Sequence, residues 1–93
     1  MIKKREIFPI GNPVDGTAVR GMADLAAVIT GRRSALRLTQ IDVAAAAGTG
    51  NRFIVELEQG KATVRADKVL AVLRELGLEL VVRPVNRSTN VRT

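Results

Sequence analysis

Apolar residues between positions 22 and 76 recur at intervals of three and four, the spacing that places side chains on one face of an α-helix. The first periodic segment covers residues 22–38 and carries Arg32 and Arg33 near its end, where cations suit the helix dipole. Its predicted inward stripe consists of Leu25, Val28, Ile29, Ala35 and Leu36. The pattern therefore predicts a long first helix.

A short second helix is predicted over residues 40–47. Thr39 is its expected N-cap, because a hydroxyl can accept a hydrogen bond from the free amides of a first turn. Gly48 is expected to end it, since glycine readily adopts a positive φ. The predicted core positions are Val43, Ala44 and Ala47.

Two further helices are predicted at residues 51–59 and 64–76. Gly60 is expected to end the third helix, while Thr63 caps the fourth and Gly77 closes it. The candidate buried residues of the third helix are Phe53, Ile54 and Leu57. The expected inward face of the fourth helix consists of Ala66, Val69, Leu70, Leu73 and Leu76.

After Gly77 the period changes to two, which is typical of a β-strand, and Pro84 stops the run. A lone strand cannot satisfy its own backbone amides and carbonyls, and residues 7–10 are only a weak candidate partner. The simplest solution is the same strand from a second copy; the alternative is an extended tail lying on its own domain. Val72 extends the apolar surface of the fourth helix beyond what one small core needs. The predicted dimer contacts are therefore Val72, Leu78, Leu80 and Val82.

Ninety-three residues are enough for one small, mainly α domain of four to five helices. We expect a flexible N-terminal arm at 1–20, a helical domain at 21–77, a dimerisation strand at 78–84 and a flexible basic tail at 85–93. A fold this small gains buried area by dimerising, which favours a homodimer.

The composition excludes several kinds of chemistry. Cysteine and histidine are absent, which rules out disulfides, thiolate zinc sites, cysteine nucleophiles and histidine bases. The nine acidic residues are scattered, and no phosphate-binding loop is present. We therefore expect neither an enzyme nor a bound cofactor.

Fifteen basic and nine acidic residues give a net charge of +6, which favours an anionic partner, nucleic acid first. Residues 24–83 carry only +2 of this charge, so two thirds of the excess lies in the terminal segments. Those segments either contact DNA phosphates or serve only solubility. No apolar run approaches the roughly 18–20 residues of a membrane span, so we expect a cytoplasmic protein.

Residues 38–61 contain the pattern with the clearest functional meaning: two short helices separated by Gly48-Thr49-Gly50. Small residues at 44–47 allow the next helix to cross closely, and a tight turn then projects that helix outward. This arrangement is the helix-turn-helix, whose second helix enters the DNA major groove. Ordinary helical hairpins also contain alanine runs and glycine turns.

The stretch resembles the lambda-repressor-like, XRE-type helix-turn-helix family. The matching elements are Leu38-Thr39-Gln40, Val43-Ala44, Gly48 and the run from Ile54 to Lys61. Within this class it is most similar to the HipB-like antitoxin group, through Asn51 to Ile54, Glu56 to Glu58, Gly60-Lys61 with Thr63, and the LGLELVV segment. The similarity covers about residues 24–84 and implies a homodimer, a partly palindromic double-stranded operator and a HipA-like kinase toxin encoded beside the gene.

The resemblance also implies roles for single residues. Gln40, Gln59 and Lys61 match phosphate-contacting positions, and the backbone amides of Thr49 and Gly50 can approach phosphate. Family members often carry Ser or Thr where Gly50 stands, so the usual cap of the third helix is missing. The base-reading positions are matched by Asn51, which can pair with adenine, and Arg52, which can pair with guanine.

Other positions have two interpretations. Glu56 either accepts a hydrogen bond from a cytosine amine or pairs with Arg52 four residues earlier, and we favour the second role. Phe53 either packs under the third helix, which we favour, or touches a thymine methyl. Glu58 and Arg33 match a structural ion pair of the family, and Arg32 is a weak candidate for a phosphate contact.

These observations together predict a DNA-binding transcriptional repressor, the autoregulating antitoxin of a HipBA-like toxin-antitoxin system. Two alternatives remain at this point. In the first alternative, the protein is mainly a protein-binding antitoxin that sequesters a kinase toxin. In the second, it is a stand-alone repressor of the phage type.

Overall fold

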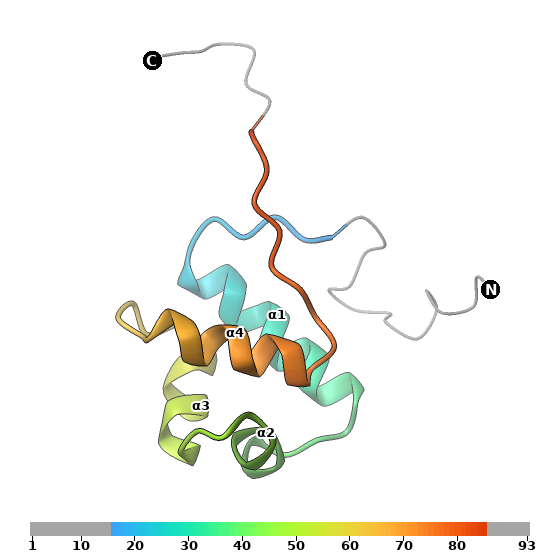
Figure 1. The fold of residues 1–93 in the computed structure, drawn as a ribbon, viewed down its shortest axis with the longest axis vertical. Coiled ribbons are helices and arrows are strands. Elements are labelled where there is room, and N and C mark those ends of the chain that lie inside the picture. Colours follow the sequence, from blue (N-terminus) through green and yellow to red (C-terminus); the bar gives the residue numbers. More distant parts are fainter. Residues whose placement is uncertain (1–15, 86–93) are drawn as a thin grey trace, which may run out of the picture.

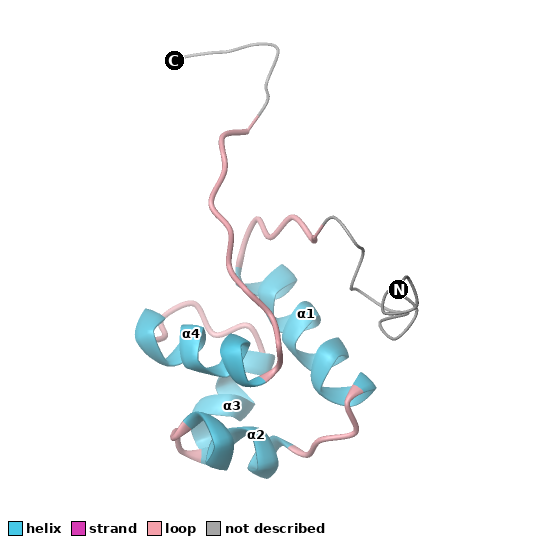
Figure 2. Ribbon diagram, turned by 45° about the vertical axis from the view of Figure 1, so that its right-hand side comes forward, coloured by secondary structure: helices cyan, strands magenta, loops and turns pink. Residues whose placement is uncertain are grey.

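The computed structural model describes residues 16–85, a range that holds four α-helices and no strand. The helices are α1 (Met22–Ala35), α2 (Gln40–Ala47), α3 (Asn51–Glu58) and α4 (Ala66–Glu75). Figures 1 and 2 both show α2 and α3 at one end of the molecule, while the chain leaves α4 toward the other end. The predicted mainly α domain of four to five helices is confirmed, with four helices in residues 16–85. Residues 1–15 of the predicted arm and 86–93 of the predicted tail lie outside the described residues.

A single aliphatic core joins the four helices. It consists of Ile29, Val43, Ala44, Ile54, Leu57, Val69, Val72, Leu73 and Leu76. The α2 helix packs against both α3 and α4, and α1 packs against α3. Removing one such aliphatic side chain from water contributes about 1.5–3 kcal/mol. The short helices therefore depend on one shared set of contacts.

The first helix ends earlier than its apolar pattern predicts. Ala35 is its last residue, and both Ala35 and Leu36 are exposed, so their predicted inward positions are wrong. Arg37 has a φ of 60°, and the amide of Leu38 donates to the Arg33 carbonyl at 3.1 Å. Because the chain reverses there, the last apolar positions leave the inward stripe.

The fourth helix begins later than predicted. Arg65 is its N-cap and makes no side-chain capping bond, so the assignment of Thr63 as cap is wrong. The chain is extended before Ala66, and Val64 packs against the core from that segment. Packing of Val64 thus replaces the first turn that the periodicity suggested.

The inward face of α4 is also rotated relative to the prediction. Ala66 and Leu70 are exposed, whereas Val72 is completely buried. The buried stripe is Val69, Val72, Leu73 and Leu76. Val72 therefore belongs to the core of one chain, and its predicted role as a dimer contact is wrong.

Arg32 is buried on the same face of α1 as Ile29, which lies three residues earlier in the chain. Its Nε donates to the carbonyl oxygen of Leu76 at 2.6 Å, which joins α1 to the C-terminal end of α4. Burial lowers the pKa of the Arg32 guanidinium from its usual value. The interpretation of Arg32 as a phosphate contact is therefore wrong, because its side chain is turned inward.

Residues 78–85 run away from the helices as an extended segment (Figures 1 and 2). Leu78 packs against the core, whereas Leu80, Val82 and Val85 are exposed. Within the chain as far as it is described, this segment forms no strand ladder, so the predicted strand is not present in a single copy. It borders a shallow groove lined by Leu70, Leu73, Arg74, Leu78, Glu79 and Leu80.

We predict that Gly77→Ala destabilises the fold more than Gly48→Ala does. Both glycines have positive φ, 73° and 74°, where a side chain costs roughly 1–2 kcal/mol. At Gly77 a Cβ would also lie 2.9 Å from Nη2 of Arg32, whose Nε is already bonded to Leu76, whereas at Gly48 it would meet open space. Urea unfolding of the two variants measures the difference. Equal losses would show that Arg32 moves aside freely.

Candidate nucleic-acid interface

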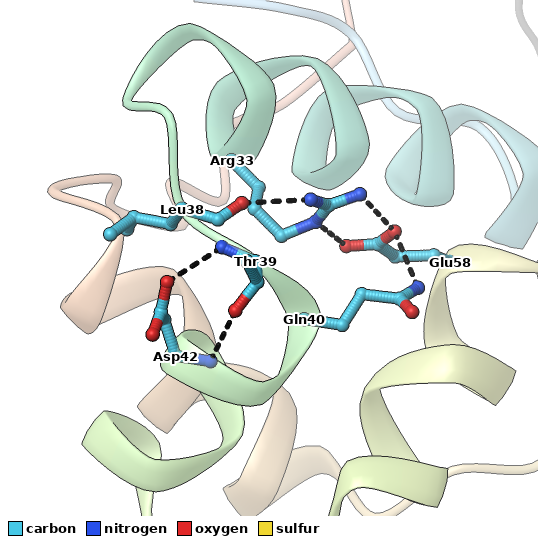
Figure 3. A network of polar contacts seen from close by, with 6 residues as sticks. All are labelled: Arg33, Leu38, Thr39, Gln40, Asp42 and Glu58. Atoms are coloured by element: carbon cyan, nitrogen blue, oxygen red, sulfur yellow. Dashed lines mark hydrogen bonds and ion pairs between the residues drawn. The ribbon is translucent and has the colours of Figure 1, made fainter.

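The α2 helix begins with a reciprocal capping box, drawn in Figure 3. The amide of Asp42 donates to the Thr39 hydroxyl at 3.0 Å, and the amide of Thr39 donates to the Asp42 carboxylate at 2.8 Å. The hydrogen bond from the Thr39 amide to the carboxylate, and after it the Thr39 side chain, hold the pKa of Asp42 below its usual value. The predicted N-cap is confirmed, as is Gly48 as the end of the helix, with a φ of 74°.

The turn from α2 to α3 consists of Thr49 and Gly50. The Thr49 amide donates to the Ala44 carbonyl at 2.9 Å, and its hydroxyl donates to the Gly50 carbonyl at 3.2 Å. Gly50 is the N-cap of α3, and no side chain bonds the first turn. The predicted absence of a side-chain cap is confirmed, and the Thr49 hydroxyl does not replace it.

A polar network holds the C-terminal end of α3 against the end of α1 (Figure 3). Arg33 donates to Glu58 through Nε at 2.6 Å and through Nη2 at 3.0 Å, and its Nη1 donates to the Leu38 carbonyl at 2.9 Å. The hydrogen bonds from Arg33 to Glu58 raise the pKa of Arg33 above its usual value, against the opposing effect of burial. The predicted ion pair is confirmed, with side chains only 17% and 7% exposed.

Gln40 joins the same network. Its side-chain nitrogen donates to Oε1 of Glu58 at 3.0 Å, so the first residue of α2 is bonded to the last residue of α3. An amide nitrogen carries two N–H donors, and one remains for a further acceptor. The interpretation of Gln40 from the sequence did not include this bond, because the two residues are 18 positions apart.

The outer face of α3 carries the predicted base-reading residues. Asn51 and Arg52 are exposed in its first turn, and the Arg52 side chain is 88% exposed. Gln59 and Lys61 are exposed directly after the helix. The structure thus brings these polar groups together on the exposed face of α3 and the turn that follows it.

Glu56 lies between two cations of this face. Its Oε2 accepts from Nε of Arg52 at 3.1 Å, and its Oε1 accepts from Nζ of Lys61 at 3.2 Å. The hydrogen bond from Lys61 and, in second place, the one from Arg52 lower the pKa of Glu56 from its usual value. The predicted pair of Arg52 with Glu56 is confirmed, and the contact with Lys61 adds a partner that the sequence analysis did not assign.

Phe53 is half-buried and packs against the aliphatic core. The ammonium group of Lys68 lies 5.7 Å from the centre of its ring, within reach of a cation–π contact. Packing, the favoured interpretation of Phe53, agrees with this placement. No spacing signal pointed to Lys68, since it lies on α4 and meets the ring only through the tertiary fold.

The exposed face of α3 and the turn after it carry hydrogen-bond donors, two cations and the carboxylate of Glu56. Across residues 16–85, no three acidic side chains gather as they would to hold a metal ion. None of the helices described is both long enough and apolar enough to cross a membrane. This surface offers two side-chain amides, which both donate and accept hydrogen bonds, and two cations, which suits an anionic polymer with hydrogen-bonding edges.

We predict that Gly50→Ser raises the free energy of unfolding by about 0.5–1 kcal/mol, because it supplies the missing cap of α3 and restricts the unfolded chain. Gly50 has a φ of −81°, and an added Cβ would meet nothing within 4 Å. The matched control is Gly48→Ser, which has equal space but a φ of 74° and should destabilise. Thermal and urea unfolding measure both variants, and destabilisation by Gly50→Ser would contradict the prediction.

Comparison with known proteins agrees with this geometry. No family model matches the chain. An uncharacterized HTH-type transcriptional regulator of Sinorhizobium fredii, y4mF, is 42% identical over 62 residues, which cover 67% of this chain and 82% of that protein. The identity and the coverage are high enough to show the family, and α2 and α3 form the helix-turn-helix that its name describes. This chain belongs to the family of HTH-type transcriptional regulators.

Proposed function

We propose that this protein is a sequence-specific DNA-binding repressor that inserts α3 into the major groove of its own operator. The observation that carries the proposal is the exposure of Arg52 in the first turn of α3, next to Asn51. The opposite face of the same helix is fixed by the completely buried Ile54 and Leu57. An eight-residue helix held in this way presents its first turn outward, as a recognition helix does.

Phosphate contacts would position the protein on the duplex without reading sequence. Lys61 and Gln59 follow α3, and the backbone of Thr49 and Gly50 precedes it, so both ends of the helix offer donors. The free N–H of Gln40 would add a donor at the start of α2. Base discrimination would come from Asn51 toward adenine and Arg52 toward guanine.

A homodimer is the second part of the proposal. Leu80 and Val82 are exposed on the extended segment 78–85, and Leu70 is exposed beside it at the groove. Pairing of two such segments as antiparallel strands would satisfy their backbone groups and cover these apolar side chains. Two copies of α3 would then read half-sites about one helical turn apart on a partly palindromic operator.

The antitoxin role is the most specific part of the proposal and rests on the resemblance of Asn51 to Ile54 and of the LGLELVV segment to the HipB-like group. In that role the protein would bind a HipA-like kinase toxin and repress the operon that encodes both. The alternative is a stand-alone repressor of the phage type.

We expect Arg52→Ala to weaken binding to the upstream DNA by about 1–3 kcal/mol, while binding to a scrambled duplex changes much less. The reason is that a base contact is lost only on the specific sequence. Fluorescence anisotropy on both duplexes measures the two effects, with Arg20→Ala as a control that removes one charge from the segment before α1. Equal loss on both duplexes with Arg52→Ala would remove Arg52 from base reading.

Sedimentation velocity is expected to show a dimer for the wild-type protein and a monomer for Leu80→Asp, because a carboxylate cannot be buried between two apolar strands. Ile41→Asp is the matched control, since Ile41 is 66% exposed, comparable to Leu80 at 57%, but lies on α2. A Leu80→Asp variant that sediments like the wild type would contradict the proposed interface.

Co-expression with a kinase-like protein encoded beside the gene is expected to yield a stable complex. The complex should survive Arg52→Ala, because toxin binding does not need the base-reading residue. Absence of such a neighbouring gene, or failure of the two proteins to co-purify, would favour the stand-alone repressor.

A further inference from the structure

The carboxylate of Glu56 is shared by the two cations that face outward at α3. Arg52 bonds one oxygen at 3.1 Å and Lys61 bonds the other at 3.2 Å. Both cations are more exposed than Glu56 itself, whose side chain is 28% exposed. The three groups together carry one net positive charge where the two cations alone would carry two.

The atoms used in the Arg52 contact matter for what remains available. Glu56 accepts from Nε, which leaves the terminal pair Nη1 and Nη2 as the outward edge of the guanidinium. A guanidinium edge with two parallel N–H groups matches the O6 and N7 acceptors of guanine. The contact with Glu56 therefore leaves the donor pair needed for a base edge while it restrains the rest of the side chain.

The contact with Lys61 has a different consequence. A lysine ammonium on an exposed turn is free to bind any nearby phosphate, and such contacts carry no sequence information. With its ammonium bonded to Glu56, Lys61 is partly neutralised, so its attraction for a phosphate is weaker although two of its three N–H donors remain. That carboxylate also repels the DNA backbone, whichever sequence is bound.

We propose that Glu56 is a specificity-determining positioning residue, which weakens the phosphate contacts of Arg52 and Lys61 on any sequence and aims the terminal edge of Arg52 at a guanine. The inference rests on the proposed function, in which α3 meets DNA. Glu56 acts through its two partners and need not touch a base itself.

The test compares Glu56→Gln with Glu75→Gln, which makes the same change of charge at the last residue of α4. Glu75 lies at the other end of α4 from Lys68, which contacts Phe53 of α3. Binding to upstream DNA and to a scrambled duplex is measured by fluorescence anisotropy over a range of salt concentrations. Thermal unfolding of each variant verifies that it is folded.

For Glu56→Gln we expect tighter binding to the scrambled duplex and a lower ratio of specific to non-specific affinity. The slope of log K against log salt should become steeper by about 1–2, since each added phosphate contact contributes about 0.9. Adding Lys61→Gln to Glu56→Gln should return about one unit of that slope. Glu75→Gln should leave the slope and the ratio near those of the wild type.

Two results would overturn the proposal. One is a Glu56→Gln variant that behaves like Glu75→Gln on both duplexes. The other is loss of specific binding with no gain on the scrambled duplex, which would mean that Glu56 contacts a base directly. If the wild type shows no preference for its upstream DNA, the proposed repressor function fails, while the salt slopes on the scrambled duplex still decide whether Glu56 restrains the two cations.

Discussion

The ion pair between Arg33 and Glu58 is the contact on which the geometry of the α3 surface depends. An eight-residue helix is too short to be stable alone, so its direction is set by what its ends and its buried face touch. Ile54 and Leu57 fix that face in the core, and the two-pronged bond to Arg33 fixes the last turn. The first turn then extends outward with Asn51 and Arg52, and the rest of the candidate interface follows from that placement.

Two carboxylates of α3 show how burial separates structural from surface roles. Glu58 is 7% exposed and is bonded by Arg33 and Gln40, so it joins three helices. Glu56, two residues earlier, is on the outer face and holds only exposed cations. The same residue type thus stabilises the fold at one position and modulates surface charge at the other. The reason is that two residues that are two positions apart on a helix point to different sides of it.

Local signals in the sequence were sufficient for the helix-turn-helix itself. The bounds of α2, its cap at Thr39 and the start of α3 at Asn51 were predicted correctly, because each depends on groups a few residues apart. The start of α4 was not, because packing of Val64 against the core outweighs the cap signal at Thr63. The burial of Val72 was not either, because it depends on how α4 packs against helices that are distant in the sequence. The inward turn of Arg32 also depends on a distant partner, the Leu76 carbonyl. Residues 78–85 form no strand within the described part of the chain, because a period-two pattern does not by itself provide a pairing partner.

Arg32 and Arg33 are consecutive residues of α1, yet their side chains bind different parts of the molecule. Arg32 bonds the carbonyl from which the C-terminal segment departs, and Arg33 bonds the last residue of α3. A single peptide unit therefore connects the base of the extended segment with the helix that carries Asn51 and Arg52. If two copies pair through their extended segments, the rigidity of the last turn of α1 would set the angle between the two α3 helices.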